Sequence, residues 1–298
     1  MPAEPIRAAG RISVIVISRN EGRYLRQTFR NLEDTLPDDA EILVVDDGST
    51  DGSPDFLARR RGRVKLYRTP GLGVAKARNF GARRATGDML VFADAHLKLP
   101  DEWWKPMLSA LRNPRVGAVA PAIRGMNPEH HEGYGLTFRG PKMEVKWIRR
   151  KPAGPAAVPI LPGCTLAMPR AVFERTGGGW DDGLLQRGNV DNEVSVRLWL
   201  LGYELLVLPN VVVEHRFRKS SPFPVGWPQY LHNRLRLAFV HFNEERLGRV
   251  VGSLRAYPGF GEALRLIAES DVAVRRREIL GERSRNDDWY FDRFQIKW

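Results

Sequence analysis

The chain has 298 residues, of which 43% are hydrophobic and 28% charged, a composition that excludes a disordered chain. Its single cysteine, Cys164, excludes a fold held together by internal disulfides. No apolar run approaches the roughly 18–20 residues of a membrane span, and the polar segment Met1–Arg11 does not resemble a secretory signal. We therefore expect a cytoplasmic protein with a core large enough for an enzyme.

The charge is strongly unbalanced, because 47 Lys and Arg residues face 35 Asp and Glu residues and give a formal net charge of +12. Such an excess points to nucleic acid, an anionic membrane surface or an anionic small substrate as partner. For any one stretch of cations, a solvated basic face is the simpler alternative. The cations gather in three stretches, residues 59–68, 76–84 and 139–151.

Strand and helix patterns alternate along the first part of the chain, which is typical of a mostly parallel sheet with helices on both faces. Ligands of such sheets gather at the carboxyl ends of the strands. Buried strands are predicted at 12–17, 41–45, 64–67 and 89–93, and helices at 20–37, 54–60 and 71–85.

The middle of the chain is less regular, and its character changes near residue 220. Further helices are predicted at 103–111 and 191–201, and further strands at 116–120, 160–168 and 205–214. The many Pro, Gly and basic residues of 124–162 predict a long functional loop. Helical patterns rich in Arg cover 227–247 and 261–280. We therefore predict an α/β domain over residues 1–220 and a helical C-terminal extension over 221–298. The extension is a candidate lid, subunit contact or membrane contact.

The strand predicted at 41–45 is followed directly by two acidic residues, Asp46 and Asp47. Carboxylates at the carboxyl end of a strand can accept hydrogen bonds from a base or a ribose hydroxyl. An ordinary turn that caps a helix is the alternative, because Asp-Gly turns are common.

The strand predicted at 89–93 is followed by Asp94, Ala95 and His96. Alternation along an extended chain places Asp94 and His96 on the same side. A carboxylate oxygen and an imidazole nitrogen in this spacing suit a divalent cation, with Mn²⁺ expected first and Mg²⁺, Co²⁺ or Zn²⁺ as alternatives. A capping Asp beside a surface His is the structural alternative.

A third motif, His215 to Lys219, follows the strand predicted at 205–214. His215 is a candidate third metal ligand, and Arg218 with Lys219 would suit a diphosphate.

Asp191 and Glu193 lie at the predicted start of the helix at 191–201. Acidic residues favour helix N-termini through capping and the helix dipole, so a structural role is one interpretation. A general base at the end of an acceptor loop is the other. The glycine-rich stretch 71–79 matches neither the dinucleotide fingerprint nor a P-loop, although Arg78 within it could face an anion.

Taken together and in this order, these patterns resemble the family 2 glycosyltransferases of the GT-A fold. The resemblance covers about the first 220 residues. It implies a Rossmann-like α/β fold that binds a nucleoside diphosphate sugar, UDP-linked by preference, through a divalent metal. The matching stretches are Ile12–Arg30, Glu41–Ser53, Gly71–Gly87, Leu90–Pro100, Pro162–Trp180 and Asp191–Pro209.

The resemblance also implies roles for individual residues. Ser18, Asp46 and Asp47 would contact the nucleobase and ribose. Arg78 matches the arginine after the family's Gly-rich turn, and Asp94 takes the first position of its Asp-x-Asp metal motif.

Two positions depart from the family 2 pattern. His96 gives Asp-x-His, which is similar to the polypeptide N-acetylgalactosaminyltransferases, and these also carry a downstream His followed by Phe-Arg-Lys, as at His215 here. That family retains the anomeric configuration, whereas family 2 in general inverts it. Asp191 stands where inverting enzymes have their base and the retaining family has Asn, while Val190 replaces the Glu of both. We expect inversion with Asp191 as base, and retention is the alternative.

The resemblance places Trp180 and Glu193 near the junction of sugar and acceptor, with a core anchor as the alternative for Trp180. A metal-dependent glycosyltransferase is therefore the expected function. The alternatives are a nucleic-acid or anionic-surface binding protein and an inactive nucleotide-sugar scaffold. The basic stretches lack interleaved aromatic residues, so no nucleic acid is expected. The acceptor stays unidentified, and peripheral contact with the inner face of a membrane and oligomerisation through residues 221–298 are further expectations.

Overall fold

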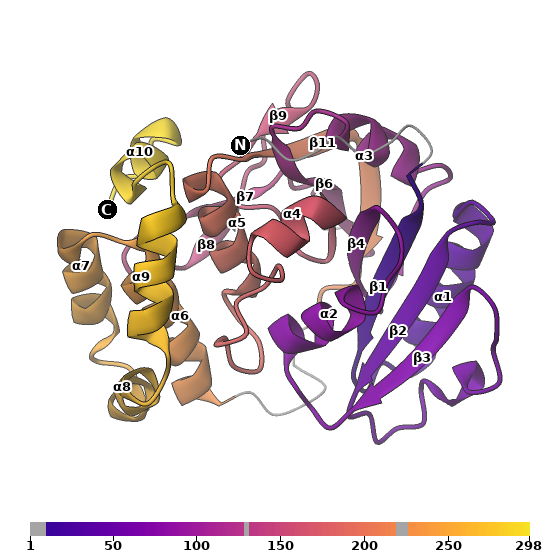
Figure 1. The fold of residues 1–298 in the computed structure, drawn as a ribbon, viewed down its shortest axis with the longest axis horizontal. Coiled ribbons are helices and arrows are strands. Elements are labelled where there is room, and N and C mark those ends of the chain that lie inside the picture. Colours follow the sequence, from indigo (N-terminus) through magenta and orange to yellow (C-terminus); the bar gives the residue numbers. More distant parts are fainter. Residues whose placement is uncertain (1–9, 128–130, 219–225) are drawn as a thin grey trace.

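The structure, a computed structural model, describes residues 10–127, 131–218 and 226–298. A twisted central sheet is flanked by helices, and the C-terminal helices α6 to α10 gather at one end of the molecule (Figure 1). The strands are β1 Ile12–Ser18, β2 Glu41–Asp47, β3 Val64–Thr69, β4 Met89–Asp94, β5 Leu97–Lys98, β6 Val116–Gly125, β7 Leu136–Phe138, β8 Val145–Trp147, β9 Ala156–Ala157, β10 Thr165–Pro169 and β11 Glu204–His215. The helices are α1 Arg23–Thr35, α2 Val74–Ala82, α3 Trp104–Leu111, α4 Arg170–Arg175, α5 Val190–Leu200, α6 Trp227–His241, α7 Glu244–Leu254, α8 Phe260–Ala268, α9 Val272–Glu282 and α10 Asp287–Arg293.

The strand order of the main sheet is β3-β2-β1-β4-β10-β6-β11-β5, with β9 paired to β11. Strands β3, β2, β1 and β4 are parallel, so their carboxyl ends lie at one edge. Strand β10 runs antiparallel to both of its neighbours, and β11 is parallel to β6. The predicted mixed α/β class with a mostly parallel sheet is confirmed.

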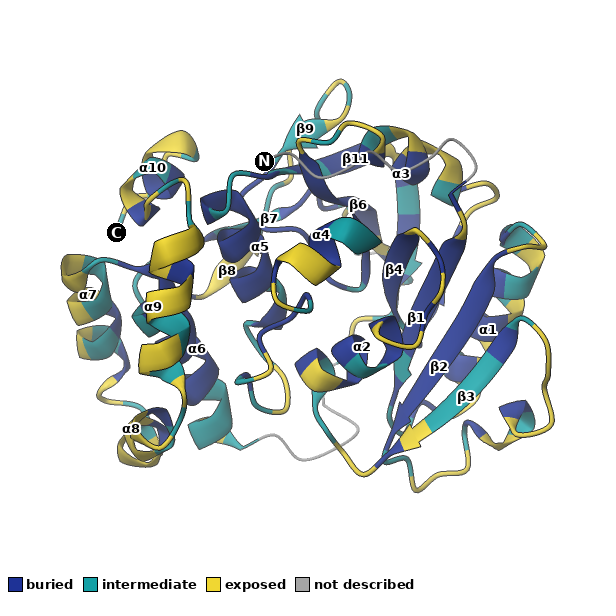
Figure 2. Cartoon of the chain, in the orientation of Figure 1, coloured by how far each residue is buried: buried dark blue, intermediate teal, exposed yellow. Residues whose placement is uncertain are grey.

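The sheet is covered on both faces because its central strands are apolar on both sides. One buried cluster lies under α1 and α3 and includes Leu25, Phe29 and Trp103. The other lies under α2, α4 and α5 and continues into α6 through Leu231 and Leu235. The strands are accordingly buried along most of their length, whereas α8 and α9 expose one face (Figure 2). The C-terminal helices thus share a core with the sheet, and the boundary near residue 220 stays a prediction.

Several predicted elements differ in the structure. Residues 54–60 form only a short 3₁₀ turn, Asp55–Leu57, because Phe56 and Leu57 alone cannot supply an apolar stripe. The helix predicted over 227–247 is divided at Asn243, whose side chain accepts a hydrogen bond from the backbone of Arg246 and so caps α7. The stretch 261–280 is likewise divided into α8 and α9. Within 124–162 the chain forms the hairpin β7–β8 instead of a plain loop.

Candidate active site

A cleft of about 1160 Å³ opens at the carboxyl ends of the parallel strands. One wall consists of the ends of β1, β2, β4 and β11, and we call it the strand-end wall. The opposite wall, which we call the helical wall, is formed by residues 186–192 and α6. The cleft therefore lies where an α/β sheet of this topology binds its ligand.

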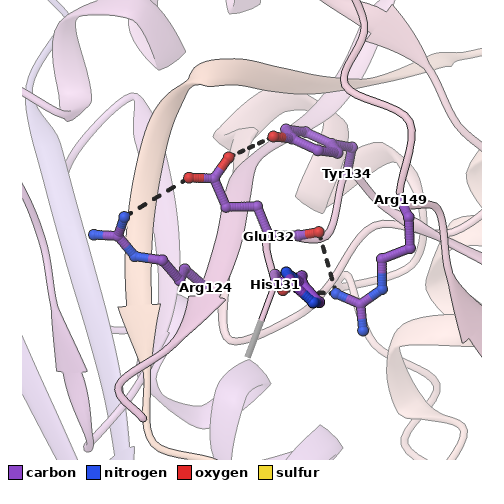
Figure 3. A pocket seen from close by; sticks show the side chains of 5 residues that line it. All are labelled: Arg124, His131, Glu132, Tyr134 and Arg149. Carbon is purple, nitrogen blue, oxygen red and sulfur yellow. Dashed lines mark hydrogen bonds and ion pairs between the residues drawn. The ribbon is translucent and has the colours of Figure 1, made fainter. Parts of the chain in front are cut away.

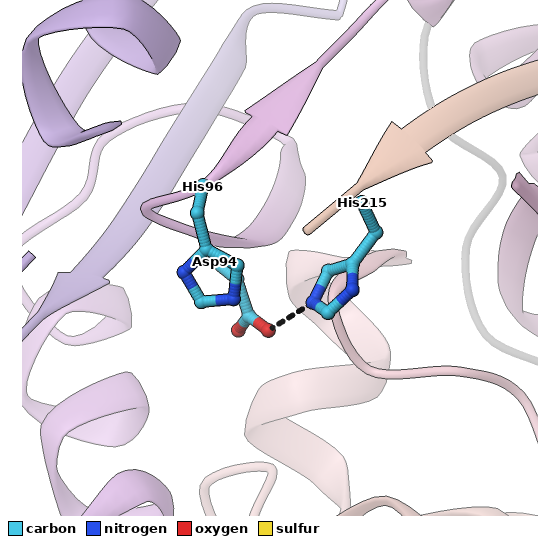
Figure 4. Close-up of side chains that lie close together, drawn as sticks. All are labelled: Asp94, His96 and His215. Atoms are coloured by element: carbon cyan, nitrogen blue, oxygen red, sulfur yellow. Dashed lines mark hydrogen bonds and ion pairs between the residues drawn. The ribbon is translucent and has the colours of Figure 1, made fainter. Parts of the chain in front are cut away.

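Three side chains in the strand-end wall could hold a metal ion. One ligand atom each from Asp94, His96 and His215 lie within 4.8 Å of one another (Figure 4). Asp94 ends β4, and the antiparallel pairing of β11 with β5 sets His215 opposite Leu97, next to His96. One carboxylate oxygen and two imidazole nitrogens suit Mn²⁺ and related ions. The structure thus brings together the three metal ligands that the sequence predicted.

Glu21 contacts this cluster, although no local sequence pattern indicates it. Its Oε2 lies 2.9 Å from Nδ1 of His96, which leaves Nε2 of that ring to face the cluster. The same carboxylate forms an ion pair with Arg218, the residue that the sequence predicts at a diphosphate. Lys219, its expected companion, lies outside the described residues. We had assigned Glu21 to the start of a helix, whereas it lies in the loop before α1.

The charges around Asp94 keep it ionised. Burial favours the neutral acid, but the hydrogen bond from His215 and the charges of Arg78 and the two histidines hold the pKa of Asp94 well below its usual range. Arg78 itself is 3% exposed. Its guanidinium donates to Asp191 at 2.8 Å and to the carbonyl of Gly163 at 2.8 Å, and it packs over the ring of Trp180.

Asp191 lies in the first turn of α5 and faces the cleft. Its carboxylate is pressed against Gly163: a Cβ on that glycine would lie 1.9 Å from Oδ1. A glycine at 163 is therefore required for the Arg78–Asp191 ion pair. Cys164 lies below this pair, and burial together with the nearby carboxylates raises the pKa of its thiol, so it is not an activated nucleophile.

The predicted nucleoside contacts have different environments. Ser18 lines the cleft, and its buried hydroxyl has no hydrogen-bond partner among the described residues. Asp47 also lines the cleft, but it accepts hydrogen bonds from Thr69 and from the backbone of Leu72 and Gly73, and so it fixes the turn before α2. Asp46 is buried, pairs with Arg68 and does not line the cleft.

The sequence predicts that Glu193 and Trp180 lie near the junction of sugar and acceptor. Both instead lie in the core, and neither lines the cleft. Glu193 is fully buried and pairs with Arg197 and His241. Arg197 also donates to the carbonyls of Thr176 and Gly179, which fixes the glycine turn before Trp180. Both residues can act on the cleft only through the neighbours that they position.

Comparison with known protein families matches residues 13–177 to "Glycosyl transferase family 2". The chain belongs to this family. It is 34% identical to human polypeptide N-acetylgalactosaminyltransferase 15 over 250 residues, which is 76% of this chain and 39% of that protein. It is 32% identical to polypeptide N-acetylgalactosaminyltransferase 11 of Xenopus tropicalis, over 78% of this chain and 43% of that protein. The chain thus spans less than half the length of these relatives.

Solved glycosyltransferase structures are similar to this fold. GalNAc-T7, solved with UDP, GalNAc and Mn²⁺, matches with a TM-score of 0.79 at 23% identity, over 97% of this chain and 57% of that one. A mannosyltransferase from Pyrobaculum calidifontis, solved with GDP-Man and Mn²⁺, matches with a TM-score of 0.55 at 22% identity, over 95% and 74%. The predicted GT-A glycosyltransferase fold is confirmed.

The expectation of a cytoplasmic enzyme is contradicted by the polypeptide N-acetylgalactosaminyltransferase relatives. The curated relatives are Golgi enzymes that act in the lumen. Among the described residues, no helix is long and apolar enough to cross a bilayer.

A second hollow of about 560 Å³ lies outside the cleft, in the segment predicted as a long loop (Figure 3). Its polar groups are hydrogen-bonded within it: Arg124 pairs with Glu132, which also accepts the hydroxyl of Tyr134, and Arg149 donates to the carbonyls of His131 and Glu132. Burial and the neighbouring Glu132 raise the pKa of Tyr134 to about 12.

The two larger basic stretches differ in their pairing. In 59–68, Arg60, Lys65 and Arg68 all pair with carboxylates. In 139–151, none of the six cations makes an ion pair within the part of the chain that the structure describes.

Proposed function

We propose that the chain transfers a sugar from a nucleoside diphosphate sugar, UDP-linked by preference, to a hydroxyl of a polypeptide, with retention of configuration. The observation that carries the proposal is the cluster of Asp94, His96 and His215 at the rim of a cleft large enough for a nucleotide sugar. Similarity to polypeptide N-acetylgalactosaminyltransferases supports the polypeptide acceptor.

The donor set of the cluster fits a divalent metal. Mn²⁺ accepts mixed oxygen and nitrogen ligands, whereas Mg²⁺, the alternative, prefers oxygen. When bound, such an ion neutralises charge on a leaving diphosphate. Asp94, His96 and His215 would hold it, and Glu21 would orient His96 by accepting the Nδ1 hydrogen.

The nucleoside would lie along the ends of β1 and β2. Ser18 offers a hydroxyl with no internal partner, and Asp47 positions the glycine turn against which a base can pack. Arg78 holds Asp191 and the carbonyl of Gly163 in fixed positions beside the metal cluster. We assign residues 1–220 to this catalytic domain and 221–298 to an extension that completes the cleft.

Retention is favoured over the inversion that we expected, because the relatives are retaining enzymes. Asp191 is bound by Arg78 through a 2.8 Å ion pair, which engages one of its carboxylate oxygens and fixes its orientation. We therefore assign Asp191 to positioning of the donor and not to proton abstraction.

The test is calorimetric titration of the protein with UDP in the presence and absence of Mn²⁺, followed by turnover with a panel of UDP-sugars and Ser/Thr peptides. We expect UDP to bind only weakly without Mn²⁺, and proton NMR of the product to show the anomeric configuration of the donor. His215→Ala should lose the Mn²⁺ dependence, whereas His131→Ala, an exposed histidine outside the cleft, should keep it. Metal-independent UDP binding, or an inverted product, would contradict the proposal.

A further inference from the structure

One arginine of the helical wall is buried without a counter-charge among the described residues. Arg234 on α6 is 6% exposed and lines the cleft. Its Nε has no hydrogen-bond partner, and Nη2 reaches only the hydroxyl of Tyr230, at 3.4 Å. No carboxylate in the described residues lies within ion-pair distance of it, and the sequence of 219–225 contains no Asp or Glu. A buried guanidinium that lacks an anion is costly, so such a group is normally paired.

The next inward arginine of the same helix shows the usual arrangement. Arg236, two residues on, is fully buried, and it forms a bidentate pair with Asp181 at 2.7 and 2.8 Å. It also pairs with Asp271 at 2.7 Å. Within the described ranges, two carboxylates therefore pair with one buried arginine of α6 and none pairs with the other.

The carboxylates that line the cleft are all engaged elsewhere. Glu21 pairs with Arg218, Asp94 and Asp191 pair with Arg78, and Asp47 accepts backbone hydrogen bonds. None of them forms an ion pair with Arg234.

A second donor that has no partner in the described part of the chain lines the same wall. Asn189 precedes α5 and lines the cleft, and its Nδ2 is buried without a partner while its Oδ1 accepts from Asn192. Gly188 packs on the ring of Tyr230, against which Arg234 also packs, so the loop and α6 are in contact here. The N-terminus of α5, an 11-residue helix, opens at the same place and favours negative charge.

We propose that Arg234, with Asn189, binds an anionic group of the substrate, a carboxylate or a phosphate, on the helical wall of the cleft. This inference rests on the proposed function, since the group belongs either to the donor sugar or to the acceptor. It is distinct from the diphosphate, whose expected place is the metal cluster on the strand-end wall. A charge-assisted contact to a planar guanidinium selects an anion over a neutral isostere.

Two matched pairs of substrates distinguish the two sources. The donor pair is UDP-glucose and UDP-glucuronic acid, which differ in the carboxylate at C6. The acceptor pair consists of Ser/Thr peptides that carry either Asp or Asn next to the hydroxyl residue. With Mn²⁺ present, the wild-type protein should bind the acidic member of one pair about ten-fold or more tightly than the neutral member, as measured by calorimetry. Equal affinity within both pairs would overturn the proposal.

The variant Arg234→Met tests the residue, and Arg236→Met is the matched control. Arg234→Met should lose the preference for the acidic member, while its affinity for UDP alone stays within about two-fold. Because it removes an unpaired buried charge, its melting temperature should be unchanged or raised, whereas Arg236→Met should melt several degrees lower. A preference that persists in Arg234→Met, or a melting loss equal to that of Arg236→Met, would contradict the proposal. Failure of the wild-type protein to bind UDP would instead contradict the proposed function, and the melting comparison still tests whether Arg234 is unpaired.

Discussion

The two walls of the cleft use charged residues in different ways. In the strand-end wall, Asp94, His96 and His215 converge on one point and stay partly accessible, with side chains 24%, 14% and 11% exposed. Behind the helical wall, Glu193 and Arg197 of α5 are completely buried and bind each other. The first group is arranged to hold a ligand, and the second holds the backbone of the glycine turn. We therefore expect changes in the metal cluster to affect binding and changes in the buried Glu193–Arg197 pair to affect stability.

The largest effect should come from removal of a metal ligand in the strand-end wall. In His215→Ala, Asp94 keeps Arg78 as partner, so the fold should persist. Loss of one of three ligands should abolish measurable Mn²⁺ binding and reduce turnover by about a thousand-fold or more. Titration of Mn²⁺ followed by electron paramagnetic resonance, together with a thermal melt, measures both quantities. A large fall in melting temperature would show that the variant loses activity because it unfolds, and the strand-end wall would then be structural.

The opposite result, a loss of stability without a loss of binding, should come from Arg197→Met in the buried pair behind the helical wall. It leaves the carboxylate of Glu193 buried with only His241 as partner, and it frees the carbonyls of Thr176 and Gly179. Breaking a buried ion pair by removing one partner costs about 3–5 kcal/mol. Urea unfolding should show this loss, while the affinity of the folded fraction for Mn²⁺ should stay close to that of the wild-type protein. Weakened Mn²⁺ binding would show that the two walls are not separable.

The two walls also differ in how far the sequence predicts them. Asp94 and His96 are two residues apart after a clear strand, and His215 ends another, so local patterns were sufficient to find the metal cluster. Glu21 contacts His96 and Arg218, which lie 75 and 197 residues away, and no local pattern predicts such contacts. The buried arginines of α6 were missed because arginine on a helix normally reaches solvent. Their burial comes from long-range packing, in which α6 contacts α8 and α9 and Arg236 pairs with Asp181.

Net charge was the weakest guide for the same reason. Residues 59–68 and 139–151 look alike as sequence, but the first is paired with acids such as Glu33 and Glu41 from other elements, and the second has no ion pair within the described residues. Pairing depends on long-range contacts that a count of charges does not contain.

A smaller effect should come from Glu21, which acts on the metal cluster through His96. Glu21→Ala removes the acceptor that orients His96 and should weaken Mn²⁺ affinity by about 10- to 100-fold. Glu21→Gln keeps an acceptor oxygen and should restore most of the affinity. Glu33→Ala, which breaks an exposed ion pair with Arg60 on the outer side of the sheet, is the control and should change nothing. If the alanine and glutamine variants lose the same Mn²⁺ affinity, Glu21 acts through its charge and not by orienting His96.

The walls should also respond differently to mild acid. Burial lowers the pKa of His241 and His232 on α6, although the nearby Glu193 and Asn233 oppose it. These histidines stay neutral in the folded state and charge in the unfolded state, so stability that is present above about pH 6.5 is lost as the pH falls below it. Asp94, whose pKa is lowered, stays ionised through this range and contributes nothing to the change. The melting temperature should fall by a few degrees between pH 7.5 and 5.5, and His241→Gln should flatten the curve. An unchanged slope in that variant would show that His241 does not titrate with folding.

The smallest effect should come from Asp191, the residue at which the two walls meet. If Arg78 fixes it as a positioning group, Asp191→Asn keeps an oxygen that can accept from Arg78, and turnover should fall by less than about ten-fold, an effect of under about 1.4 kcal/mol. A catalytic base has no such substitute, because an amide cannot take the proton, and its loss would cost about 100- to 10,000-fold. Steady-state turnover of Asp191→Asn, with Asp182→Asn as a control for a half-exposed acid on the same loop, therefore separates the two roles. A large fall confined to turnover, with UDP affinity unchanged, would return Asp191 to the role of a base and would argue for inversion.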